Sequence, residues 1–223
     1  FQHANGRSAE KYMWETRGSG PAIFDLEGAG DLDLFFVNGG PLGGASRGPA
    51  ASDALSRNNG RGMFEEITAA AGLRESAYGM GVAVGDYDRD GDADLYVVNH
   101  GPNVLWRNNG DGTFSDVTAA AGVGDPGWGS SAVFFDAEGD GDLDLYLVQS
   151  GDLRAPDPAR YASRYYANDG RGHFREVSAE RGGADGGYGF GVAWGDYDGD
   201  GRPYLYVTQV GPTVLDRDDG GGQ

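Results

Sequence analysis

The sequence predicts an all-β protein made of repeated four-stranded antiparallel units. Two motifs alternate along its 223 residues: an acidic stretch that turns abruptly apolar, and an Asn-Asn-Gly stretch that runs into alternating residues. The short runs alternate with period two, as strands do, and no stretch has a convincing amphipathic helical pattern. Units of roughly 50 to 60 residues with four strands each, repeated in register, describe the blades of a β-propeller.

The acidic stretch occurs four times, and the spacing from each Asn-Asn-Gly motif to the next acidic stretch is constant. It reads "FDLEGAGDLDLFFVN" at 24–38, "GDYDRDGDADLYVVN" at 85–99, "FDAEGDGDLDLYLVQ" at 135–149 and "GDYDGDGRPYLYVTQ" at 195–209. From Gly60, Gly110 and Gly170 to the next acidic start is 26 residues each time. We therefore expect 1–223 to be a single propeller domain, or a segment of a larger propeller, with units at approximately 18–72, 78–122, 127–182 and 188–223.

The second unit shows the pattern of one blade. We expect strands at 78–85, 95–99, 104–107 and 113–118, with the acidic loop 86–94 between the first two. The "NNGDG" stretch predicts a type I′ hairpin, because Asn and Gly both tolerate positive φ. The "AAAG" that follows the fourth strand is expected to form a turn at most.

The loop 86–94 carries five aspartates at every second position, where they repel one another unless a cation lies among them. Side chains at positions 1, 3, 5 and 9 of such a loop converge on one point, together with the backbone carbonyl of position 7. Gly91 at position 6 permits the sharp turn. Oxygen ligands in this number suit Ca²⁺, whereas the smaller octahedron of Mg²⁺ tolerates so many carboxylates poorly. The alternative is a set of ordinary Asx turns, in which aspartates accept hydrogen bonds from nearby amides without metal.

The four loops differ in completeness. The second and third have an acid at each of positions 1, 3, 5 and 9 and predict two full Ca²⁺ sites, whereas Ala29 and Tyr204 interrupt the first and fourth and predict weaker ones. The candidate metal residues, position 7 included, are Asp25, Glu27, Asp31, Asp33, Asp86, Asp88, Asp90, Asp92, Asp94, Asp136, Glu138, Asp140, Asp142, Asp144, Asp196, Asp198, Asp200 and Arg202.

Composition excludes several classes of function. The net charge of −18 repels phosphate backbones, so nucleic acid is not an expected partner, and no apolar run predicts insertion into a membrane. The chain has no cysteine and three histidines, and no G-x-S-x-G, P-loop or H-E-x-x-H motif. We therefore expect no catalytic residues.

Insertions at 41–55 and 151–166 lengthen the first and third units and are expected to project from one face. The second insertion concentrates arginine and tyrosine, which are enriched at interface hot spots. The candidate partner-binding residues are Arg154, Arg160, Tyr161, Arg164 and Tyr165. The alternative is a solvated loop whose tyrosines cover a blade.

The "DxDxDGxxDL" loops, the "YGMGVAVGDYD" and "YGFGVAWGDYD" strands and the "NNGDGTFSDVT" hairpin resemble FG-GAP/VCBS repeats of the integrin α-type β-propeller. They are most similar to the ASPIC/UnbV-associated, cartilage acidic protein-like branch. The resemblance implies loops that bind Ca²⁺ and an extracellular, secreted or cell-surface module.

On this basis we expect a non-catalytic, calcium-binding module for adhesion, ligand recognition or scaffolding, with a protein or glycan ligand on the loop face. Two alternatives remain. One is a structural subunit of a surface filament or other homo-oligomer that pairs through open strand edges. The other is a propeller hydrolase that acts on glycans or esters.

Overall fold

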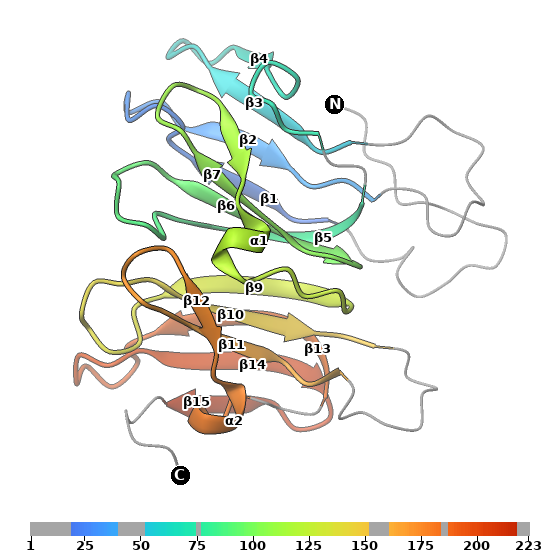
Figure 1. Ribbon diagram of the computed structural model, residues 1–223, viewed down its shortest axis with the longest axis vertical. Helices are drawn as coiled ribbons and strands as arrows, with labels where there is room; N and C mark the ends of the chain where they lie inside the picture. The colour runs from blue at the N-terminus through green and yellow to red at the C-terminus, as the bar shows by residue number, and fades with distance from the viewer. Residues whose placement is uncertain (1–18, 40–51, 75–76, 152–160, 184–186, 218–223) are drawn as a thin grey trace, which may run out of the picture.

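The computed structural model describes residues 19–39, 52–74, 77–151, 161–183 and 187–217 and has an all-β fold. Four separate antiparallel sheets follow one another along the chain and stack face to face, as propeller blades do (Figure 1). Within each sheet the strands lie in chain order, so every connection joins neighbouring strands. No helix in the described part of the chain is long and apolar enough to cross a membrane.

Each of the first three sheets has four strands, and three strands of the fourth are described. The first sheet contains β1 (Pro21–Phe24), β2 (Asp33–Phe36), β3 (Ala54–Asn58) and β4 (Phe64–Glu66). The second contains β5 (Tyr78–Gly85), β6 (Asp94–His100), β7 (Val104–Asn108) and β8 (Phe114–Asp116). The third contains β9 (Gly129–Phe135), β10 (Asp144–Gln149), β11 (Arg164–Asn168) and β12 (Phe174–Glu176). The fourth contains β13 (Tyr188–Gly195), β14 (Tyr204–Val210) and β15 (Val214–Arg217).

The hydrophobic core consists of three layers, one between each pair of successive sheets. Phe35 and Leu95 belong to the first layer, and Tyr96 and Leu145 belong to the second. Tyr146 and Leu205 belong to the third. Consecutive residues of β6 thus face opposite neighbours, because side chains alternate along a strand. Both faces of the inner blades are buried, and the strands read as nearly continuous apolar runs for this reason.

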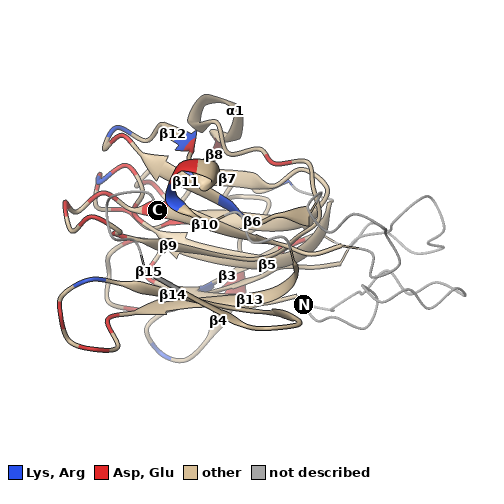
Figure 2. Ribbon diagram, turned by 90° about the horizontal axis from the view of Figure 1, so that it is seen from below, with Lys and Arg blue, Asp and Glu red and all other residues tan. Residues whose placement is uncertain are grey.

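The acidic loops all join the first strand of a sheet to the second. Figure 2 shows the acidic positions of these loops, coloured red on the ribbon, at one edge of the stack, so the acidic residues that the sequence distributes over four repeats are concentrated at one end of the blades.

Two details differ from the sequence-based expectation. In the hairpin between β7 and β8, Gly110 and Gly112 have φ of 72° and 80°, but Asn109 does not lie at positive φ. A type I′ turn needs positive φ at both central residues, so this prediction was wrong. Instead the amide of Asn109 donates to the carbonyl of Thr113 at 2.9 Å and closes a longer loop.

The expectation of no more than a turn after the fourth strand was also wrong. A single turn of α-helix forms there in the second and third units, as α1 (Thr118–Ala121) and α2 (Ser178–Arg181). Each ends at a glycine in the left-handed conformation, Gly122 at φ 80° and Gly182 at φ 81°, a C-terminal signal that the sequence contains.

The outer face of the fourth sheet carries large apolar side chains that solvent reaches. Phe190, Tyr206 and Leu215 are 43%, 49% and 52% exposed. Their counterparts in the second unit, Met80, Tyr96 and Leu105, lie in the core layer beneath the third sheet. The fourth sheet thus presents the same type of face as the second, without a sheet against it among the described residues.

One buried acid outside the acidic loops gives stability a pH dependence. Asp53 accepts a hydrogen bond from the amide of Asn38 at 2.7 Å, and burial raises its pKa to about 7. The unfolded chain has the ordinary pKa of 3.8, so the contribution of this group is fully present below about pH 4 and is lost as pH rises through 7. Asn103 occupies the corresponding position in the second unit and accepts the amide of Asn99 at 2.7 Å.

We therefore expect Asp53→Asn to flatten the pH dependence of stability. Urea unfolding of both proteins at pH 5 and pH 8 measures the effect: the free energy of unfolding of the natural chain, relative to the variant, should fall toward pH 8. An equal difference at both pH values would show that Asp53 titrates normally.

Candidate metal centre

The first aspartate of each acidic loop closes the loop by accepting backbone amides. Asp86 accepts those of Asp90 at 3.1 Å and Gly91 at 3.0 Å. The same arrangement recurs in the other three units around Asp25, Asp136 and Asp196. These hydrogen bonds reach amides three to five residues on, so they are not Asx turns, which reach the amide two residues on. Asx turns form at position 5 of the second, third and fourth loops, where Asp90, Asp140 and Asp200 accept such an amide, and this element of the metal-free alternative is present there. The hydrogen bonds of the first aspartate fix the direction of the loop and do not involve the acids at positions 3 and 9.

The acid at position 9 fastens the loop to the body of the blade. Asp94 is fully buried, and its two oxygens accept the amides of Asn108 at 2.8 Å and Tyr87 at 3.1 Å. Asp33 does the same in the first unit, and Asp144 accepts the amide of Asn168 in the third. Burial raises the pKa of Asp94 to about 8, and the two amides oppose this rise.

The hairpin asparagine links the second blade to the first and the third blade to the second. The side-chain amide of Asn108 donates to the carbonyl of Leu26, in the acidic loop of the first unit, at 2.9 Å. In the next unit Asn168 donates in the same way to Tyr87, in the second loop, at 2.8 Å. We name these two contacts the asparagine links.

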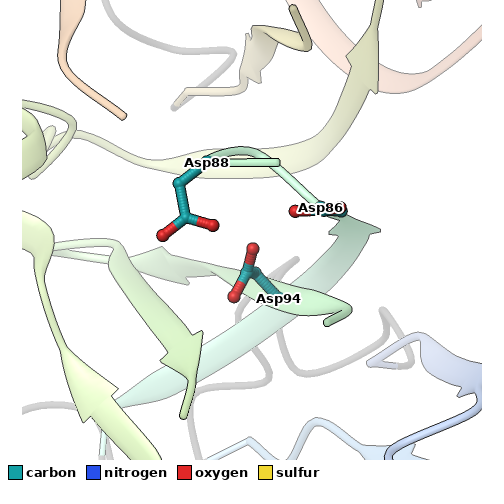
Figure 3. A group of neighbouring side chains, drawn as sticks. All are labelled: Asp86, Asp88 and Asp94. Atoms are coloured by element: carbon teal, nitrogen blue, oxygen red, sulfur yellow. The ribbon is translucent and has the colours of Figure 1, made fainter. Parts of the chain in front are cut away.

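Three carboxylates of the second loop converge. Asp86, Asp88 and Asp94 each place an oxygen within 4.8 Å of the other two. Figure 3 shows the carboxyl groups of Asp88 and Asp94 turned toward each other, with Asp86 beside them. Burial raises the pKa of Asp88, and the charges of Asp90 and Asp86 add to this effect.

One oxygen in this group has no hydrogen-bond partner. The Oδ1 atom of Asp88 is buried and accepts no hydrogen bond from the described residues. A buried carboxylate oxygen without a donor is costly, and a cation among the three carboxylates would remove that cost. The donor set is entirely oxygen and suits a hard divalent cation, so these residues fit Ca²⁺.

The third loop, although complete in sequence, does not bring its acids together in this way. Glu138 forms an ion pair with Arg181, and Asp142 forms one with Arg89 at 2.6 Å. Asp144 accepts a hydrogen bond from the hydroxyl of Tyr165 at 3.1 Å. A pocket of about 400 Å³ lies beside these residues and is also lined by Asp140. No three acids of the loop 136–144, which the structure describes in full, converge as the second loop's do.

The outer loops also differ from each other. In the first, Glu27 pairs with Arg57 at 3.2 Å, and Asp33 is committed to backbone amides. In the fourth, Asp196, Asp198 and Asp200 converge within 4.8 Å but are exposed. The hydroxyl of Tyr204, at position 9, donates to Asp198 at 3.0 Å. The structure therefore groups three acids in the second loop, which is complete in sequence, and in the fourth loop, which is incomplete.

In the first three loops the side chain at position 7 packs against a glycine of the following hairpin. The sequence assigns only a backbone carbonyl to Asp31, Asp92, Asp142 and Arg202 at this position. A Cβ atom built on Gly110 would lie 2.6 Å from Oδ2 of Asp92, and the equivalent glycines meet Asp31 and Asp142 in the same way. The hairpin glycines of the first three units thus leave room for the acid at position 7.

The proposed partner surface on the second insertion is reduced by burial. Arg154 and Arg160 lie outside the described residues. Tyr165 is 2% exposed, so its side chain belongs to the core and not to a contact surface. Arg164 pairs with Asp125 at 3.5 Å. Of the candidates, Arg164 and Tyr161 keep partly accessible side chains.

Comparison with known proteins identifies the repeat. The family model described as FG-GAP-like repeat matches residues 25–97, 86–147 and 154–207. No curated protein matches the chain. Among solved structures, the chain is similar to a lectin from Agrocybe aegerita that recognises non-reducing terminal N-acetylglucosamine, at 16% identity and a TM-score of 0.37. That match covers 92% of this chain and 64% of the lectin's length. With its family match extending over most of its length, the chain belongs to the FG-GAP-like repeat family.

Proposed function

We propose that the protein is a non-catalytic, calcium-binding module whose principal cation site is the loop 86–94. The observation that carries this proposal is the convergence of Asp86, Asp88 and Asp94 around a buried oxygen of Asp88 that accepts no hydrogen bond. These three residues would hold the ion, together with Asp90 and the backbone of Asp92. When bound, Ca²⁺ neutralises the like charges of the loop.

The role of the cation would be to keep the loop edge of the blades rigid for ligand recognition. Loops positioned on a rigid sheet scaffold are common sites of binding. FG-GAP-like repeats are typical of extracellular proteins, and extracellular calcium modules bind with a Kd of about 10⁻⁴ to 10⁻³ M. We therefore place the module outside the cell, in adhesion or scaffolding, with a protein or glycan as its ligand. We also propose that the repeats belong to the ASPIC/UnbV-associated, cartilage acidic protein-like branch, and the resemblance to that branch implies the same extracellular role.

Direct calcium binding tests the proposal. Isothermal titration with Ca²⁺ should show a site that is lost in Asp88→Asn, because the amide removes one charge and keeps the shape. The matched control is Asp111→Asn in the neighbouring hairpin, where an exposed aspartate bonds to Thr113 and should not affect binding. Equal calcium binding by the natural chain and by Asp88→Asn would contradict the assignment of this loop.

A second candidate function is assembly through the outer sheets. The exposed face of the fourth sheet carries Phe190, Tyr206 and Leu215. In the second sheet the corresponding face is covered by the third sheet. At the other end, Ile23 is 61% exposed, whereas Phe134, its counterpart in the third sheet, is buried against the second. The first sheet of a second copy would therefore fit the fourth sheet as the third fits the second, head to tail.

Sedimentation velocity over a range of protein concentrations tests this assembly. Tyr206→Glu should shift the protein toward the monomer, because it places a charge in the centre of the contact. Met63→Glu is the control, since Met63 is 67% exposed in the hairpin between β3 and β4. A natural chain that stays monomeric at every concentration would contradict assembly between copies.

A further inference from the structure

The third acidic loop contacts a cation that belongs to the chain itself. The guanidinium of Arg181, in α2, forms an ion pair with Glu138 and donates to the hydroxyl of Tyr165 at 3.2 Å. That hydroxyl in turn donates to Asp144 at 3.1 Å. The guanidinium carbon also lies 5.5 Å from the centre of the Tyr165 ring, within cation–π range. Arg181 therefore acts on positions 3 and 9 of the loop, the positions that Asp88 and Asp94 occupy in the second unit.

The first and second units have alanine at the position of this side chain. Arg181 stands in "VSAERG", where the second unit has Ala121 in "VTAAAG" and the first has Ala71 in "ITAAAG". Ala121 and Ala71 are buried in the core layers. In the second unit, where alanine stands, the position 3 acid keeps a buried oxygen without a donor. In the third unit, where arginine stands, the position 3 acid is paired.

We infer that Arg181 replaces the calcium ion in the third unit, so that the position 3 acid of the loop 136–144 is paired within the chain and the loop binds no Ca²⁺ in the natural chain. A divalent cation there would have to displace the guanidinium from Glu138 and would lie beside a fixed positive charge. Arg89 adds to the effect, because it extends from the second loop and pairs with Asp142 at 2.6 Å. The family's metal thus does not fit this loop as the chain presents it, although the loop's sequence is complete.

As a consequence, neighbouring blades would differ in their dependence on calcium. The second loop would depend on external calcium, whereas the third would keep its order when calcium is removed, since its counter-charge is covalently part of the chain. The inference uses the proposed calcium site of the second loop only as a contrast, and the binding assay below separates the two.

Equilibrium dialysis against ⁴⁵Ca²⁺, at a fixed free concentration, counts the ions bound per chain. Arg181→Gln should raise the count by one relative to the natural chain, and Arg181→Gln combined with Glu138→Gln should return it to the natural value. Arg175→Gln is the matched control, because Arg175 lines the same pocket but pairs with Glu180 at 2.7 Å, and it should leave the count unchanged.

Glu138→Gln in the natural background keeps the test decisive if Arg181→Gln does not fold. The inference expects no change in the calcium count, and loss of one ion would overturn it, since the loop would then be a metal site in the natural chain. An unchanged count in folded Arg181→Gln would overturn it as well. Failure of the proposed function has a different signature, because it is an unchanged count in Asp88→Asn, a variant that leaves the third loop intact.

Discussion

Replacing Asp94 with alanine is expected to destabilise the protein by at least about 2 kcal/mol, with calcium or without it. The substitution leaves the buried amides of Asn108 and Tyr87 without an acceptor, and a buried donor without a partner costs about 1 to 3 kcal/mol. It also removes the acid that joins the loop to the start of the hairpin. Domains of this size are commonly stable by only about 5 to 15 kcal/mol, so this is a large share of the total.

Urea unfolding in excess Ca²⁺ and in chelator separates the two roles of this residue. The loss in chelator measures the amide contacts, and any further loss in Ca²⁺ measures the contribution to the ion. Asp111→Ala, an exposed aspartate in the next hairpin, should change stability by no more than about 1 kcal/mol. If Asp94→Ala were as stable as Asp111→Ala in chelator, the structural role of the position 9 acid would be refuted.

The second large effect is expected from Gly79→Ala at the junction of the first two blades. A Cβ atom there would lie 2.1 Å from Cγ1 of Val37 and 3.0 Å from the carbonyl oxygen of Asn38. The amide of Gly79 also donates to that carbonyl at 3.0 Å, so the two backbones must stay close. Forcing a methyl group into such a contact typically costs about 1 to 3 kcal/mol, and we expect the upper part of that range because backbone atoms cannot rotate away.

A glycine in the fourth sheet provides the control for this variant. A methyl group added at Gly195 would meet no atom within 4 Å, so Gly195→Ala should be nearly neutral or slightly stabilising, by up to about 1 kcal/mol. Thermal unfolding of the two variants side by side measures the difference. Equal melting temperatures would show that blade contacts at Gly79 adjust freely, against the expectation.

The repeat register predicted the sheets well, because period-two alternation and turn residues are local properties. The expected strand at 78–85 coincides with β5, and the loop 86–94 was placed between the right strands. What sequence reasoning could not predict is which acids would face each other. The second and third loops are equally complete in sequence, yet the partners that distinguish them, Arg181 and Tyr165, are 37 and 21 residues from Asp144 along the chain.

A weak signal for this difference was present. "AERG" in the third unit departs from the "AAAG" of the first two, and a charged residue at a position that is otherwise a buried alanine needs a partner. The structure identifies Glu138 as that partner. Tyr165 shows the opposite error, since its residue type suggested a contact surface whereas its position in β11 directs it into the core.

The asparagine links have a consequence for how the array unfolds. Because Asn108 and Asn168 each anchor a hairpin to the acidic loop of the unit before it, none of the first three blades can separate from its neighbour without breaking one of these hydrogen bonds. Stability in such a linear array is a sum of unit terms and nearest-neighbour terms, and these contacts enlarge the second kind. An ion held in the second loop would thereby strengthen the cooperativity of the three linked blades, well beyond the residues that touch it.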